Sequence, residues 1–187
     1  MKYLAFFAVL ILFIGCGTKK EVKKDGTELF THDFKEGDLR GWTTTGEAFN
    51  FQPTLGDNPY VRHRGQPSQH QGKYWICTYE KYQGREGQKP GDIQGDGPQG
   101  TMTSAEFVID MKRISLLIGG GSNPQARVEL IVNGKSVFQA HGQENESMER
   151  LLWDVSAYKG QKARIRAVDE DPAGWGHINF DDIIFEY

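Results

Sequence analysis

The chain has 187 residues, of which 37% are hydrophobic and 25% are charged, proportions that exclude an intrinsically disordered chain and fit one globular domain. The formal net charge of −3 at pH 7 provides no basic surface, so nucleic acid is not an expected partner. The 23 glycines and the aromatic content of 12% favour short strands joined by tight turns.

An apolar run, residues 3–14, follows Met1 and Lys2 at the start of the chain. This run is too short for a membrane-spanning helix of a mature protein, but it has the length of the hydrophobic part of an export signal. We therefore expect a signal helix over residues 1–15. An ordinary cleaved secretory signal and an uncleaved N-terminal anchor are the alternatives.

The end of this run, Phe13-Ile14-Gly15-Cys16, resembles the lipobox of bacterial lipoproteins. The resemblance implies that Cys16 is acylated and becomes the first mature residue, so that a lipid anchor holds the chain at a membrane of the cell envelope. An aspartate after the cysteine would be an inner-membrane retention signal of the enteric type, and Gly17 stands there instead. We therefore expect the outer membrane or the cell surface as the location.

Residues 16–27 are expected to form a flexible tether, because their many charges leave no apolar face to bury. The remaining residues, 28–187, form the expected folded domain. Cys77 is the one cysteine after Cys16, so an internal disulfide of this domain is excluded. We expect Cys77 to be a small buried residue rather than a nucleophile, since no histidine lies near it in the sequence.

No long stretch of the domain has helical periodicity, and strand signals recur instead. The Asn133-Gly134 pair separates two such runs and predicts a type I′ hairpin turn, since both turn positions need a positive φ. Residues 113–118 are apolar enough for a central strand that is buried on both faces. The expected strands are residues 28–34, 74–79, 101–109, 113–118, 127–132, 135–140, 149–155, 163–168 and 176–187.

The last expected strand changes the parity of its apolar residues. Ile178 and Phe180 share one face, whereas Ile183 and Phe185 have the opposite parity. A strand with one buried face needs an inserted residue to make this change. We therefore expect a β-bulge near Asp181-Asp182.

Short strands separated by turn residues predict an all-β fold, a single β-sandwich of the jelly-roll type. The first and last strands are expected to pair, which would place the two ends of the domain close together. Residues 84–100, rich in Gly, Pro, Gln and Asp, are expected to form a long loop. Long loops in compact domains are often functional.

Four segments carry a resemblance to known families. Phe34–Trp42 resembles the opening of galactose-binding-like jelly rolls, among them cellulose- and xylan-binding modules. Leu117–Gly121, Trp153–Ser156 and Gly174–Asp182 together resemble the β-sandwich domain found beside levanase- and invertase-type glycoside hydrolases and in exported proteins of planctomycete-like bacteria. The resemblance covers most of residues 29–187 and implies a galactose-binding-like jelly roll.

The resemblance also implies a metal position. In the xylan-binding relatives a structural calcium lies between the first and last strands, and the matching positions here are residues 33–36 and Asp182. Lys35 stands where those relatives carry glutamate, so Glu36 and Asp182 are the candidate calcium ligands. The catalytic carboxylates of the associated hydrolases belong to a separate propeller domain, and the resemblance therefore implies no catalytic residue here.

Alternation along the last strand places His177, Asn179 and Asp181 on one side. This polar strip would either hydrogen-bond sugar hydroxyls or satisfy backbone groups of neighbouring loops. Aromatic faces pack against the C–H faces of sugar rings, and we expect Trp42 and Trp153 in the core rather than in such a site. The candidate ligand-binding residues are Tyr79, Tyr82, Arg85, Trp175, His177 and Asn179.

These observations predict a non-catalytic, membrane-tethered carbohydrate-binding module of the cell envelope, with a glycan as its partner. A structural or protein-interaction module with an envelope protein as its partner is the alternative. A glycan hydrolase or lyase on a jelly-roll scaffold is a third, minor hypothesis, for which Asp169, Glu170 and Asp171 would supply an acid and a base. For these three acidic residues we expect a solvated turn instead.

Overall fold

The computed structural model describes residues 30–63 and 66–187. The expected signal helix, the acylation site Cys16 and the tether over residues 16–27 lie outside the described residues. Within the described ranges, none of the helices has the length and apolar character needed to cross a membrane.

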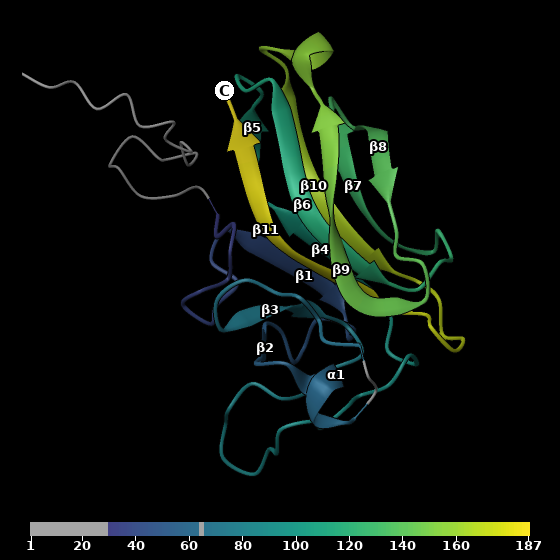
Figure 1. Cartoon of the computed structure of the whole chain (residues 1–187). Helices are drawn as coiled ribbons and strands as arrows, with labels where there is room; N and C mark the ends of the chain where they lie inside the picture. Colours follow the sequence, from purple (N-terminus) through teal and green to yellow (C-terminus); the bar gives the residue numbers. More distant parts are fainter. Residues whose placement is uncertain (1–29, 64–65) are drawn as a thin grey trace, which may run out of the picture.

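Two antiparallel sheets form the structure (Figure 1). The first sheet has the order β1-β4-β10-β7-β8, with β5 also paired to β10, and the second has the order β2-β3-β11-β6-β9. The all-β sandwich predicted from the sequence is therefore confirmed. The first sheet contains β1 (Trp42–Gly46), β4 (Gly100–Ser104), β5 (Phe107–Val108), β7 (Ala126–Val132), β8 (Lys135–Ala140) and β10 (Lys162–Asp169). The second contains β2 (Thr54–Leu55), β3 (Tyr74–Cys77), β6 (Arg113–Gly120), β9 (Asn145–Asp154) and β11 (Ile178–Glu186), and the helical pieces are α1 (Asn58–Val61) and a 3₁₀ turn (Ser156–Tyr158).

The hydrophobic core lies between the two sheets. Val128, Leu130 and Val132 of β7 alternate with more polar residues and are all buried, as strand periodicity requires. The central strand β6 is buried at every position after Arg113, which confirms the expectation of a strand covered on both faces. Trp153 belongs to this core, as expected from the sequence.

The predicted hairpin and bulge are both present. Asn133 and Gly134 join β7 to β8 with φ angles of 48° and 79°, the two positive values that a type I′ turn needs. The pairing of β11 with β6 shifts register between Asp181 and Ile184, and Asp182 has a φ of 46°. The bulge explains how apolar residues of opposite parity on one strand reach the same core.

The expected first strand is wrong for the part that is described, residues 30–34, which forms bends. The Thr31 hydroxyl accepts a hydrogen bond from the Phe34 backbone, and Phe34 has a φ of 48°, so the chain folds back on itself instead of extending. One backbone hydrogen bond, from the Ile183 N–H to the His32 carbonyl, links this segment to β11. The segment contributes to the core through its buried aromatic rings rather than through a ladder.

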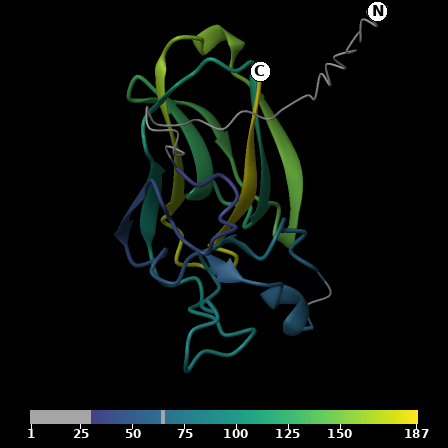
Figure 2. The same cartoon turned by 90° about the vertical axis from the view of Figure 1, so that its left-hand side faces the viewer.

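The end of the sandwich away from the C-terminus is built from irregular chain. Helix α1, the short strand β2 and the long connection from β3 to β4 gather there (Figures 1 and 2). The loop expected over residues 84–100 is present, because no helix or strand is found between β3 and the start of β4 at Gly100 in this described part of the chain. Side-chain amides hold this loop in place: the Gln94 amide donates to the Ala48 carbonyl at 2.7 Å, and the Gln88 carbonyl oxygen accepts from the Gln83 N–H at 2.8 Å.

Candidate functional site

An open hollow of about 370 Å³ lies at this end of the sandwich. It forms where the β3–β4 connection and the turn before β11 meet the start of β9 and the segment at Gln66. Its lining combines aromatic rings with polar side chains, which is the composition of a small-molecule site. The lining residues are Gln66, Tyr79, Asp96, Glu146, Gly174, Trp175 and His177.

A tight turn presents Trp175 to the hollow. The Gly176 N–H donates to the Ala173 carbonyl, and Trp175 has a φ of 65°, an unusual value for a bulky residue. Gly121 makes this arrangement sterically feasible, because a Cβ atom there would overlap the Trp175 carbonyl oxygen. The Trp175 ring stacks on His177, with ring centroids 5.5 Å apart and an interplanar angle of 25°.

His177 is buried behind this ring and lies between two carboxylates. Its Nδ1 is 2.8 Å from Asp96 Oδ1, and its Nε2 is 3.6 Å from Glu146 Oε2. Burial alone would lower the pKa of His177, but the hydrogen bond with Asp96 and the charge of Glu146 outweigh burial and raise this pKa to about 9. The Tyr79 ring also packs on the imidazole at 5.1 Å between centroids.

Glu146 is the second buried ionic group of the hollow. Its Oε2 accepts from Asn179 Nδ2 at 3.1 Å, and its Oε1 is 3.7 Å from Arg62 Nη2. Burial would raise the pKa of Glu146, but the interactions with His177, Asn179 and Arg62 lower it below its usual value. Glu146 therefore carries a negative charge at neutral pH.

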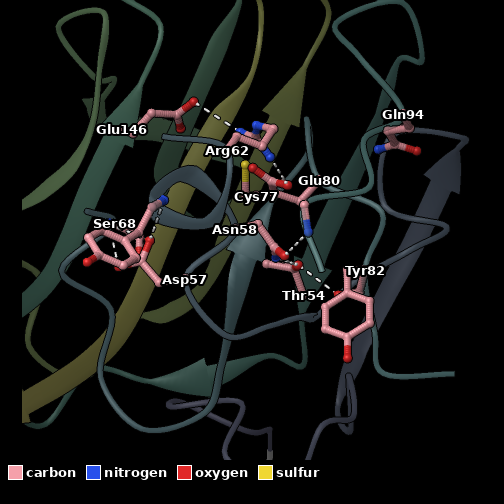
Figure 3. Close-up of polar contacts among 12 residues, drawn as sticks. Thr54, Asp57, Asn58, Arg62, Ser68, Cys77, Glu80, Tyr82, Gln94 and Glu146 are labelled. Atoms are coloured by element: carbon pink, nitrogen blue, oxygen red, sulfur yellow. Dashed lines mark hydrogen bonds and ion pairs between the residues drawn. The ribbon is translucent and has the colours of Figure 1, made fainter. Parts of the chain in front are cut away.

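Arg62, directly after helix α1, extends the ionic network away from the hollow (Figure 3). Its Nη1 is 2.6 Å from Glu80 Oε2, and its guanidinium carbon lies 5.3 Å from the centre of the Tyr79 ring. Glu80 is fully buried, and burial raises its pKa to about 7 in spite of the pairing with Arg62. The Cys77 side chain lies beside this pair (Figure 3).

The ligand-binding residues expected from the sequence fall into two groups. Tyr79, Trp175 and His177 line the hollow, and Asn179 supports it from below through its hydrogen bond to Glu146. Two others do not line it. The Tyr82 carbonyl accepts from the Thr54 hydroxyl and the Leu55 N–H, and Arg85 is exposed on the long loop, with its N–H bonded to Gln88 Oε1.

Several residues of the site were not anticipated. Asp96 stands in a Gly-Asp-Gly-Pro stretch that has the composition of a turn, and Glu146 stands in an Asn-Glu-Ser stretch typical of a surface loop. Arg62 follows a four-residue helix too short to leave a periodic signal. No local pattern marks these positions, because each belongs to the site through long-range contacts alone.

The positions proposed for calcium already have cationic partners. Both Asp182 Oδ2 and the Asp182 carbonyl bind the Arg150 guanidinium, the latter at 2.6 Å. The Lys35 ammonium lies 3.7 Å from Asp33 Oδ2, and Glu36 is exposed. These donors do not fit a calcium ion, which takes six to eight oxygen ligands.

Two other expectations concern buried polar residues. Cys77 is buried, as expected, but its sulfur, a Glu146 oxygen and a His177 nitrogen lie within 4.8 Å of one another. The expected solvated turn of acidic residues is wrong for Asp169 and Asp171, which are 1% and 5% exposed. Asp169 ends β10, where its backbone pairs within the sheet and directs the side chain inward, and burial raises its pKa to about 7.

Comparison with known proteins gives no matching family model. A protein of Aspergillus rugulosus, whose name provisionally assigns it as the glycosyl hydrolase ecdE, is 36% identical over 155 residues. These residues are 80% of this chain and only 20% of that protein, so the chain spans about a fifth of the relative's length.

Among solved structures, a family 61 carbohydrate-binding module in complex with β-1,4-galactotriose is similar, with a TM-score of 0.50 and 12% identity. The alignment covers 83% of this chain and 94% of the module. The K2 adhesin domain of Lys-gingipain aligns with a TM-score of 0.45 and 15% identity over 84% of this chain and 99% of that domain. At this level of identity, the similarity to the family 61 module establishes a shared β-sandwich fold.

Proposed function

We propose that this chain is a non-catalytic carbohydrate-binding domain that holds a neutral sugar in the hollow beneath Trp175. The observation that carries the proposal is the pairing of a half-buried indole with a fixed polar floor of Asp96, Glu146 and His177. Sugar rings offer an apolar C–H face to an aromatic ring and hydroxyl groups to polar side chains, and this hollow supplies both. The fold shared with a galactotriose-binding module supports a glycan ligand.

The charge of the hollow favours neutral over acidic sugars. Asp96 and Glu146 are both acceptors of hydrogen bonds from hydroxyl groups. A uronic acid or sulfated sugar would bring a negative charge next to these carboxylates, which is unfavourable at such short range. The ionic network behind the floor holds the polar groups in position before the ligand arrives, which lowers the entropic cost of binding.

A thermal melt of the protein against a panel of neutral and acidic oligosaccharides tests this proposal. A ligand that binds only the folded state raises the melting temperature. At a hundredfold excess over its Kd it adds about 2.7 kcal/mol to the free energy of unfolding. We expect shifts with neutral galacto- or gluco-oligosaccharides and none with oligogalacturonate. The same shifts in Trp175→Ala would contradict the placement of the ligand, and shifts with acidic sugars alone would contradict the ligand class.

A glycan hydrolase is a second candidate, favoured by one observation. Glu80 and Glu146 share Arg62, yet their pKa values are displaced in opposite directions, a pattern found in acid and nucleophile pairs of glycosidases. The name of the Aspergillus rugulosus relative is consistent with it, although the match spans a fifth of that protein. Release of reducing sugar by the wild type and not by Glu146→Gln would support this candidate; no release from any bound glycan would leave binding as the function.

We also propose that the protein is an envelope lipoprotein anchored through Cys16, as the lipobox resemblance implies. Membrane fractionation and mass spectrometry of the mature N-terminus test this. A diacylated N-terminal peptide starting at Cys16 and release of Cys16→Ser into the soluble fraction are expected. A mature N-terminus elsewhere would contradict the proposal.

A further inference from the structure

We propose that the floor of the hollow is a binding site for a thiophilic divalent metal ion such as Zn²⁺, with Cys77, Glu146 and His177 as its protein ligands. This site goes beyond the proposed binding of a sugar and does not depend on it. The ligand atoms of the three side chains all lie within 4.8 Å of one another. Cysteine, histidine and glutamate come here from β3, from the residue before β11 and from β9, so three separate parts of one sheet converge on a single point.

The spacing suits tetrahedral zinc. Zinc lies about 2.0–2.1 Å from nitrogen and oxygen ligands and about 2.3 Å from sulfur, which places neighbouring ligand atoms about 3.3–3.6 Å apart. His177 Nε2 and Glu146 Oε2 are 3.6 Å apart. A movement of the side chains by about 1 Å would bring the Cys77 sulfur into the same range.

The orientation of His177 is the second, independent observation that points to a metal ion. Its side chain is 4% exposed, and its Nδ1 is held by Asp96 at 2.8 Å. Its Nε2 is buried and has no hydrogen-bond partner among the described residues, although it faces Glu146. A carboxylate that binds one imidazole nitrogen and directs the other toward a metal is the usual second layer of a zinc site.

Glu146 is oriented in the same way. Asn179 is fully buried, and its amide nitrogen donates to Glu146 Oε2 at 3.1 Å, which fixes the plane of the carboxylate. The supporting residues Asp96 and Asn179 therefore hold two of the three ligands in place. Such support is what separates a metal site from a chance grouping of side chains.

The charge around the site can accommodate a divalent cation. Among the described residues, Glu146 and Asp96 contribute two carboxylates at the site, and the Glu80 carboxylate pairs with the Arg62 guanidinium. Arg62 is held by Glu80 at 2.6 Å, and its distance to Glu146 is longer, 3.7 Å. On binding, the ion replaces the Cys77 thiol proton and a proton on the imidazole, which pass to the solvent, and bonds to sulfur and nitrogen form in their place.

The site is open on one side. Glu146 and His177 both line the hollow, so a fourth ligand can reach the ion from there. Three protein ligands with one exchangeable position is the arrangement of zinc sites that bind or activate small molecules, whereas structural zinc sites have four protein ligands. The class of ion follows from the ligands: sulfur and imidazole select Zn²⁺, Co²⁺ or Cu ions over Ca²⁺ and Mg²⁺.

Titration of the metal-free full-length protein with Co²⁺, followed by absorption spectroscopy, tests the site directly. A thiolate-to-cobalt charge-transfer band in the near ultraviolet is expected, and Zn²⁺ should displace it. Cys16→Ser must keep the band and Cys77→Ser must lose it, since these are the two cysteines of the chain. Asp96→Asn keeps all three ligands and should weaken Zn²⁺ binding about 10–100-fold.

Stability supplies a readout that does not depend on a single variant. Zn²⁺ should raise the melting temperature of the wild type and of Cys16→Ser but not of His177→Gln, and Ca²⁺ should have no effect on any of them. If Cys77→Ser does not fold, Glu146→Gln and His177→Gln carry the test. The proposal is overturned if the band is absent, if it survives Cys77→Ser, or if Ca²⁺ and Zn²⁺ stabilise the protein equally. Sugar binding that persists in the metal-free protein would leave the proposed function intact in each of these cases.

Discussion

The Trp175 indole, which lines the hollow, lies stacked on the His177 imidazole, with 5.5 Å between ring centroids. This contact joins the two properties on which the proposed function depends, an apolar platform and a fixed polar floor. The imidazole is itself held by Asp96 through Nδ1, so the platform rests on a side chain whose orientation is fixed. The position of the indole is therefore set before a ligand binds.

Trp175→Ala should abolish most of the sugar affinity with little effect on the fold. Removal of the ring eliminates the buried apolar contact and the stacking contribution, which together amount to at least about tenfold in Kd. Isothermal titration with the best neutral oligosaccharide of the panel measures the change. Arg85→Ala is the matched control, because Arg85 is exposed on the long loop and does not line the hollow. An equal loss in both variants would place the ligand on the loop instead.

Gly121→Ala should destabilise the protein and weaken sugar binding together. The added methyl group would overlap the Trp175 carbonyl oxygen, so the turn that presents the indole must move, at a cost of about 1–3 kcal/mol. Urea denaturation and the same titration measure the two effects. Gly97→Ala is the control, since a Cβ atom there meets nothing within 4 Å and Gly97 does not line the hollow. Unchanged stability of Gly121→Ala would show that the turn accommodates the methyl group.

Arg62→Met should cost about 3 kcal/mol of stability, because it leaves the fully buried Glu80 without its charged partner. The double variant Arg62→Met with Glu80→Gln removes both charges and should regain part of that loss. A double-mutant cycle by chemical denaturation at pH 7 gives the coupling between the two side chains. Additive losses in the cycle would mean that the ion pair is not the source of the effect.

The pH dependence of stability should include a contribution from Asp169. Burial raises its pKa in the folded state to about 7, from a usual value of 3.8, so the folded protein binds this proton more tightly than the unfolded chain. The contribution is therefore favourable below pH 3.8, and stability is lost as the pH rises from there to about 7, by at most about 1.4 kcal/mol per pH unit.

Asp169→Asn removes this titration while it preserves the shape of the side chain. Denaturation curves between pH 4 and pH 8 should show the free energy of unfolding of the variant rising relative to that of the wild type as the pH rises. This difference should level off as the pH approaches 8. Glu170→Gln is the control, because Glu170 is exposed beside it in the sequence. A constant difference between Asp169→Asn and the wild type across this range would contradict the assigned pKa.

The fold could be predicted from the sequence where it depends on local chemistry. The Asn133-Gly134 turn and the bulge at Asp181-Asp182 follow from φ preferences and side-chain parity, which neighbouring residues determine. The bends at residues 30–34 were not predicted, because the hydrogen bond from the Phe34 N–H to the Thr31 hydroxyl competes with an extended backbone, and alternation of residue types does not report such a bond.

The site was predicted only in part for a related reason. Trp175 and His177 are close in sequence, and their residue types alone make them candidates for a ligand site. Asp96 is 81 residues from His177, and Asn179 is 33 residues from Glu146, so these partners meet only once the sheets and loops are assembled. The floor of the hollow is a product of the topology, and no single stretch of the chain encodes it.

Tryptophan fluorescence during titration with neutral oligosaccharides tests the central claim most directly. The chain has four tryptophans, and Trp42, Trp75 and Trp153 are at most 8% exposed, so a ligand-dependent change in emission reports on Trp175. The proposed function predicts a saturable shift that disappears in Trp175→Phe or Trp175→Ala and persists in Arg85→Ala. A glycan that binds by calorimetry without any change in this emission, or with the same change in Trp175→Ala, would contradict the placement of a sugar on the Trp175 platform.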